Sequence, residues 1–176
     1  MGAFKHAPHR KTGSDTDSLQ VEGARLKVTV VGGNEEIGRN CTLLEYGEDI
    51  IIIDLGLQFP DDDMPGVDYI IPNLSSLKGR EKNVRGVIIT HGHYDHIGGI
   101  PHLVPTLGNP PVFATDLTCG IIAKRQEDHK DKPRLNLFSV TSDDVLQLGA
   151  FKVEFFGVVH FNTHGFCANS IFDHRF

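Results

Sequence analysis

The sequence lacks the marks of secreted and membrane-spanning proteins. Its three cysteines, at positions 41, 119 and 167, form no Cys-x-x-Cys pair, so neither a disulfide framework nor a thiolate zinc knuckle is expected. No apolar run reaches the roughly 18 residues that a transmembrane helix needs, and no apolar segment follows the basic amino terminus as it does in a signal peptide. We therefore expect a cytoplasmic protein without membrane contact.

Positive charge is scarce as well. Lys and Arg together number 17 against 23 Asp and Glu, which gives a formal net charge of −6. A protein that holds nucleic acid by its overall charge needs clustered Lys and Arg to neutralise the phosphates. Any nucleic acid substrate must therefore be held by a local patch or by another domain.

Two patterns divide the chain. Residues 1–23 are polar and without periodicity, so they are predicted to form a disordered tail. Residues 24–160 carry strand and helix patterns and are long enough for one domain with a core. Within them, strands are predicted at 26–31, 41–46, 50–53, 84–90, 112–114, 135–140, 145–148 and 151–159, helices at 97–107 and 116–126, and a long loop at 56–83. The continuous apolar run at 50–53 is typical of a strand covered on both faces.

The strongest chemical signal follows directly on the predicted strand at 84–90. The hexad His91-Gly92-His93-Tyr94-Asp95-His96 places three imidazoles and a carboxylate between a buried strand and a helix. These groups suit zinc, and a rigid strand end orders them before metal arrives. The first two histidines can point to one metal ion, and the aspartate and last histidine, after the chain turns, to a second. A solvated histidine-rich turn is the alternative, but it gives no reason for the buried strand before it. His102 and His129 follow no strand end and are predicted to be surface residues.

The hexad resembles the HxHxDH signature of the metallo-β-lactamase superfamily. Four segments are similar to bacterial ribonuclease J, of the β-CASP branch: GGNEEIGRN at 32–40, IDLG at 53–56, FPD at 59–61 and THGHYDHIGGIPHL at 90–103. The similarity runs from about residue 26 to residue 160. It implies an α/β fold, the αβ/βα sandwich of the superfamily, of which this chain contains the amino-terminal half as a mixed β-sheet with flanking helices.

The resemblance also implies a chemistry. In the family the substrate is RNA, and a metal-activated water hydrolyses its phosphodiester bonds, exo- or endonucleolytically, at a site with two Zn²⁺ ions. Five metal ligands are implied, the first three for one ion and the last two for the other: His91, His93, His160, Asp95 and His96. Asp95 would lie near the attacking water, and Asp54 would orient a ligand from beside the site.

The resemblance ends at about His160. Residues 161–176 diverge from the family pattern, and the family's remaining zinc ligands lie beyond the sequence. We therefore expect a truncated or frame-shifted product with an incomplete ligand set, poor solubility and weak or no activity.

Two other interpretations stay open. The chain could be another hydrolase of this fold that acts on a small ester, although the GGNEEIGRN segment favours the nuclease branch. It could also be a non-catalytic half-domain that binds a second copy or a full-length subunit, because half a sandwich leaves a sheet face uncovered. Two tightly bound zinc ions per chain would indicate a competent site, and weak or single-ion binding a fragment.

Overall fold

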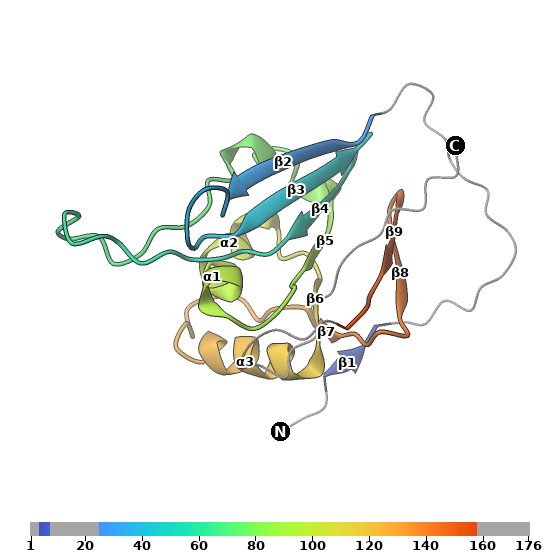
Figure 1. Ribbon diagram of the computed structural model, residues 1–176. Helices are drawn as coiled ribbons and strands as arrows, with labels where there is room; N and C mark the ends of the chain where they lie inside the picture. Colours follow the sequence, from blue (N-terminus) through green and yellow to red (C-terminus); the bar gives the residue numbers. More distant parts are fainter. Residues whose placement is uncertain (1–3, 8–24, 158–176) are drawn as a thin grey trace, which may run out of the picture.

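A mixed seven-stranded sheet forms the centre of the protein (Figure 1). The computed structural model describes residues 4–7 and 25–157, so the predicted ligand His160 and the predicted tail at 161–176 lie outside the described residues. The strand order is β1-β7-β6-β5-β4-β3-β2, with β2, β3 and β4 antiparallel and the remaining neighbours parallel. The strands are β1 (Lys5–His6), β2 (Lys27–Gly32), β3 (Cys41–Tyr46), β4 (Asp49–Ile53), β5 (Val84–Ile88), β6 (Val112–Ala114) and β7 (Leu137–Ser139). The predicted mixed sheet is confirmed.

Helices lie on one side of this sheet and a hairpin on the other (Figure 1). The hairpin consists of β8 (Val145–Leu148) and β9 (Phe151–Glu154), which pair antiparallel. The helices are α1 (Tyr94–Ile97), α2 (Ile100–Leu103) and α3 (Asp116–Gln126), with 3-10 turns η1 (Ser75–Leu77), η2 (Glu81–Asn83) and η3 (Pro105–Leu107). Across the part of the chain that the structure describes, none of the helices has the length and apolar character to cross a bilayer.

The isoleucines of β4 show how the sheet is buried on both faces. Ile50 and Ile52 belong to the core cluster on the helical side, whereas Ile51 belongs to the cluster under the hairpin. All three side chains are fully buried. Burying each such side chain contributes about 1.5–3 kcal/mol, so the run at 50–53 fixes β4 in the middle of the sheet, as its composition predicts.

The hairpin side is not covered evenly. Phe151 and Val153 of β9 pack with Ile51, Ile88 and Phe113 of the sheet. At the far edge, however, β2 exposes its outward residues, and the side chains of Val28 and Val30 are 56% and 53% accessible. Within the described residues, the β2 end of this face is therefore the part left open to solvent.

Two expectations from the sequence need correction. The helix predicted at 97–107 is broken into α1, α2 and η3, because glycines and prolines interrupt it. A Cβ on Gly98 would lie 2.5 Å from the Cβ of Leu57, and one on Gly99 would lie 2.6 Å from the backbone oxygen of Gly56. These glycines allow close packing against the strand end rather than a continuous helix.

The second correction concerns residues 4–7 of the predicted disordered tail at 1–23. Residues 1–3 and 8–23 lie outside the described residues, and for them the prediction stays a prediction. Lys5–His6 pair in parallel with β7, and Ala7 is buried in the cluster under the hairpin. His6 also contacts the carboxylate of Asp144 at 3.4 Å. The segment is too short to show periodicity in the sequence, and pairing with the exposed edge of β7 orders it.

Candidate metal centre

Parallel pairing of β4 and β5 brings Asp54 and the hexad to the same edge of the sheet. Asp54 follows β4 directly, and its backbone N–H donates to the oxygen of Ile88 at the end of β5 (2.9 Å). Its φ of 61° lies in the left-handed region, which costs a non-glycine residue about 1–3 kcal/mol. This strained turn directs the carboxylate towards the residues that follow β5.

The Asp54 carboxylate is held by Thr90 and in turn contacts His96. It accepts hydrogen bonds from the Thr90 backbone N–H (2.8 Å) and hydroxyl (2.8 Å to Oδ2). The same Oδ2 lies 2.8 Å from Nδ1 of His96. Since a hydrogen bond to one imidazole nitrogen fixes which nitrogen faces a metal, this contact supports the predicted orienting role of Asp54. Thr90 carries no metal-ligand signal, and the sequence analysis missed it.

The opposite nitrogen of His96 faces Asp95. Nε2 of His96 lies 3.2 Å from Oδ2 of Asp95. The side-chain amide of Asn40 donates to the same Oδ2 and to the backbone oxygen of Asp95, each at 3.1 Å. Asn40 is the last residue of the GGNEEIGRN segment. Its role in positioning Asp95 is seen only from this tertiary contact and not from the sequence.

Glycine is required where the β4 strand end meets the hexad. A Cβ on Gly56 would lie 1.7 Å from the backbone oxygen of Asp95 and 2.5 Å from the nitrogen of Asn40. The backbone N–H of Asn40 also donates to the oxygen of Asp95 at 3.0 Å, and the N–H of Gly56 donates to the oxygen of Asn40 at 2.9 Å. Three chain segments are thus locked together beneath the site.

The first two histidines of the hexad form a second pair. Nε2 of His91 lies 2.9 Å from Nδ1 of His93, and the two rings meet edge to face. The His91 ring also lies against the His96 ring, with 4.0 Å between the centroids. His91 is buried, so its ring is fixed at the end of the strand. All four predicted ligands of the hexad are therefore brought to one place.

The donor chemistry of the hexad fits a divalent ion. One pair offers two imidazole nitrogens, and the other offers an imidazole nitrogen and a carboxylate oxygen, which are ligands suited to zinc. Within residues 4–7 and 25–157, no group of three or more His, Cys, Asp or Glu side chains is arranged to hold a metal ion. The assignment of the five ligands and the incomplete ligand set therefore stay predictions.

Charge around His96 favours its protonated form when no metal is bound. Burial lowers its pKa, but the hydrogen bond and charge of Asp54, with the charge of Asp95, raise it, and the net pKa lies above the ordinary value. A metal ion must displace this proton, so metal binding at His96 competes with protonation.

The neighbouring thiols take no part in this chemistry. Burial, together with the charge of Asp54, raises the pKa of Cys41 to about 12. Burial and the charge of Asp116 raise the pKa of Cys119 to about 12. Both cysteines are free, buried and uncharged near neutral pH, and they therefore supply neither a nucleophile nor a thiolate ligand. Cys167 lies outside the described residues.

Comparison with known proteins places this chain in a family. Ribonuclease J of Mycoplasma genitalium is 40% identical over 136 residues, which cover 76% of this chain and 24% of that protein. Ribonuclease J 1 of Streptococcus pyogenes serotype M3 is 38% identical over 143 residues, which cover 81% of this chain and 25% of that protein. The chain thus spans about a quarter of the length of these curated relatives, and the resemblance to ribonuclease J is confirmed.

A solved structure shows the same fold. A protein of unknown function from Enterococcus faecalis V583 matches with a TM-score of 0.63 at 20% identity, over 81% of this chain and 39% of that one. At that identity the likeness concerns the fold alone. The profile of the Metallo-beta-lactamase superfamily matches residues 35–175, most of the sequence. The chain belongs to the metallo-β-lactamase superfamily.

Proposed function

We propose that this chain supplies part of the two-zinc centre of a ribonuclease of the J type, which hydrolyses phosphodiester bonds of RNA. The observation that carries the proposal is the hydrogen-bonded series Thr90–Asp54–His96, which continues to Asp95 beside the His91–His93 pair. The similarity to ribonucleases J of several bacteria supports RNA as the substrate.

The residues of this chain have distinct roles in the proposal. His91 and His93 would hold one zinc ion, and Asp95 and His96 would hold the other, with His160 as a further ligand of the first. Two bound ions would supply the Lewis-acid chemistry that activates a water molecule and stabilises charge on the phosphate oxygens. Asn40 holds the Asp95 carboxylate, which would lie near that water, in position. Asp54 keeps Nε2 of His96 directed at the site through its contact with Nδ1.

The test measures zinc binding and RNA cleavage by the 176-residue chain. Calorimetric titration should show zinc binding that His93→Ala and Asp95→Asn each weaken at least about tenfold, because each removes a direct ligand. The matched control is His129→Asn, which removes an imidazole outside the hexad and should leave zinc affinity unchanged. Equal affinity in all four proteins would contradict the proposal.

Cleavage distinguishes the substrates and the partners. A labelled single-stranded RNA should be cut slowly in the presence of zinc, as the predicted weak activity requires, and stay intact in EDTA. Hydrolysis of p-nitrophenyl acetate without RNA cleavage would instead favour the small-ester hydrolase. Analytical ultracentrifugation tests the predicted self-association or pairing with a longer subunit.

A further inference from the structure

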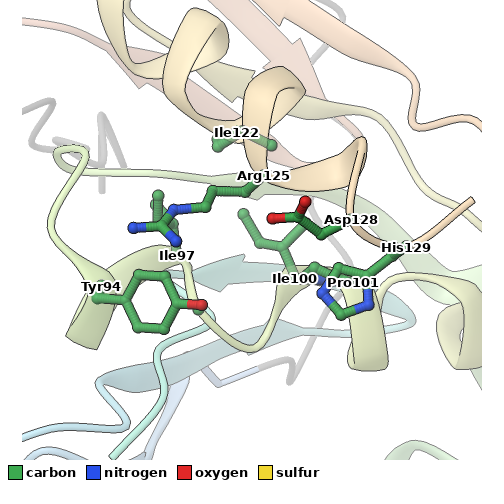
Figure 2. Close-up of a pocket in the computed structure, with 9 residues that line it drawn as sticks. Tyr94, Ile97, Ile100, Pro101, Ile122, Arg125, Asp128 and His129 are labelled. Atoms are coloured by element: carbon green, nitrogen blue, oxygen red, sulfur yellow. The ribbon is translucent and has the colours of Figure 1, made fainter.

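A series of stacked side chains runs across the surface beside the hexad, and hydrolysis does not use it. The Phe59 and Tyr94 rings are nearly parallel, with 5.8 Å between the centroids and 3° between the planes. The guanidinium of Arg125 lies over the Tyr94 ring, 4.6 Å from its centre (Figure 2). Tyr94 stands between His93 and Asp95 in the hexad, so this stack lies immediately next to the predicted metal ligands.

A second stack starts from the loop at 56–83, which also carries Phe59. The Tyr69 ring lies on the His102 ring at 4.5 Å, and its hydroxyl is 3.2 Å from Nδ1 of His102. The His129 ring meets the His102 ring edge to face at 5.1 Å. His129 also lines a pocket with Tyr94 and Arg125, between α1, α2 and the end of α3, which joins the two stacks (Figure 2). We call these six residues the aromatic ladder: Phe59, Tyr94, Arg125, His129, His102 and Tyr69.

Backbone pairing holds the two loop aromatics in register. Gln58 and Ile70 form an antiparallel bridge, with reciprocal N–H to oxygen bonds of 2.9 and 2.8 Å. Phe59 and Tyr69 are the next residues on either side of this bridge, so their side chains leave the loop on the same face. Their side chains are nevertheless 66% and 41% exposed. Rings fixed in place but left accessible are suited to binding a flat partner.

The charges around the ladder decide what kind of partner fits. Arg125 is its fixed cation, but Asp128 lines the same pocket and Asp61, Asp62 and Asp63 follow Phe59 in the loop. With a net charge of −6 on the chain, neutralisation of phosphates adds little. Stacking on rings and on a guanidinium does not depend on that charge, and it accepts any base because every base has a π-face.

We propose that the aromatic ladder stacks bases of single-stranded RNA and leads the strand to the hexad. Phe59 and Tyr69 are the accessible stacking faces, and Arg125 lies over the Tyr94 ring. This inference rests on the proposed function for its substrate, and it deepens that function by naming the residues that position the RNA. Stacking of this kind would also allow RNA binding by a chain with a net charge of −6.

The test measures RNA binding without metal, so that it is independent of hydrolysis. Fluorescence anisotropy in EDTA measures binding of the 176-residue chain to two labelled strands. One is an oligoribonucleotide of about twelve nucleotides, and the other is an abasic strand of the same length. We expect the base-containing strand to bind at least about fivefold more tightly than the abasic one. Its affinity should fall only slightly as salt rises.

Variants locate the effect. Phe59→Ala and Tyr69→Ala should each weaken binding of the base-containing strand about fivefold or more, whereas Phe59→Trp should retain it. Leu117→Ala is the matched control, because Leu117 is 53% exposed on α3 and lies outside the ladder. Circular dichroism of each variant excludes unfolding as the cause of any loss.

Three results would overturn the proposal. The first is equal binding of the abasic and base-containing strands, and the second is binding by Phe59→Ala and Tyr69→Ala as tight as that of Leu117→Ala. The third is a chain that binds neither strand. The two proposals can fail separately. Base-dependent binding without zinc-dependent cleavage would contradict only the proposed ribonuclease function. Zinc-dependent cleavage with base-independent binding would contradict only base stacking on the aromatic ladder.

Discussion

The short helix α1 presents two faces that are held in different ways. On one face, Asn40 holds Asp95 by a hydrogen bond, and the Asp54 side chain, which contacts His96, is only 7% exposed. On the other face, the Tyr94 ring stacks with the exposed ring of Phe59 from a long loop, and Arg125 lies over it. The proposed chemistry thus lies where the core enforces geometry, and the proposed contact with a flexible ligand lies where rings stay accessible.

The largest expected effect is on stability, through the packing of Gly56 beneath Asp95. Gly56→Ala places a methyl group against the backbone oxygen of Asp95, 1.7 Å away without rearrangement. We expect the free energy of unfolding to fall by about 3 kcal/mol or more, measured by urea denaturation. Gly120→Ala is the control, since nothing lies within 4 Å of a Cβ there and the change should add about 0.5–1 kcal/mol in a helix. A Gly56→Ala protein as stable as the parent would show that the backbone packing between Gly56 and Asp95 is not rigid.

Next in size is the removal of the orienting carboxylate. Asp54→Asn keeps the side-chain volume but weakens the contact with Nδ1 of His96, so zinc affinity should fall about 10–100-fold, measured by calorimetry. Asp143→Asn changes an exposed carboxylate far along the chain and should leave the affinity unchanged. If both variants bind zinc alike, Asp54 is only a strand-end residue.

A buried carboxylate elsewhere in the sheet separates stability from metal positioning. Glu45 accepts hydrogen bonds from Lys27 at 2.7 Å and lies 2.8 Å from Arg80. Because both partners are partly exposed, Glu45→Gln should lower the free energy of unfolding by about 1 kcal/mol at neutral pH. The zinc affinity of Glu45→Gln should match that of the parent. If it falls, a loss of stability alone lowers zinc affinity, and the effect of Asp54→Asn would then be one of stability.

The pH dependence of the Glu45 effect has a defined sign. The hydrogen bond from Lys27, with that from Arg80, lowers the pKa of Glu45 below its ordinary value of 4.5 against the opposing effect of burial. The stabilisation is therefore present above pH 4.5 and lost as the pH falls through the lower folded pKa. Thermal melts of parent and Glu45→Gln should converge in acid, and a constant difference would refute the ion pair's contribution.

The smallest effect is expected on the exposed face. Phe59→Ala should change the free energy of unfolding by less than about 0.5 kcal/mol, because the ring is largely accessible, although RNA binding weakens. Ile51→Ala, in the buried sheet, should cost about 2–5 kcal/mol in the same assay. A large loss of stability in Phe59→Ala would mean that the ring belongs to the core and would remove the contrast between the two faces.

Patterns that are local in the sequence predicted the central strand and the clustering of the hexad side chains. The isoleucine run at 50–53 showed a strand covered on both sides, and the hexad showed where imidazoles and carboxylate gather. Thr90 and Asn40 could not be found this way, because a hydroxyl and an amide carry no metal-ligand signature and act through contacts across up to 55 residues.

The exposed face was harder to foresee. Phe59 and Tyr94 are far apart in the sequence, and only folding of the loop onto α1 brings the rings together. His102 and His129, predicted to be surface residues, lie against each other for the same reason. Helical spacing at 97–107 suggested one helix, because a periodic pattern does not register that Gly98 and Gly99 pack against the β4 strand end.

The most direct test of the proposed metal centre is a zinc titration followed by the imidazole nitrogen NMR signals of the 176-residue chain. We expect the signals of His91, His93 and His96 to shift together while those of His102 and His129 stay in place. Shifts at His102 and His129 alone, or no shift at the hexad at saturating zinc, would contradict a metal centre at the ends of β4 and β5.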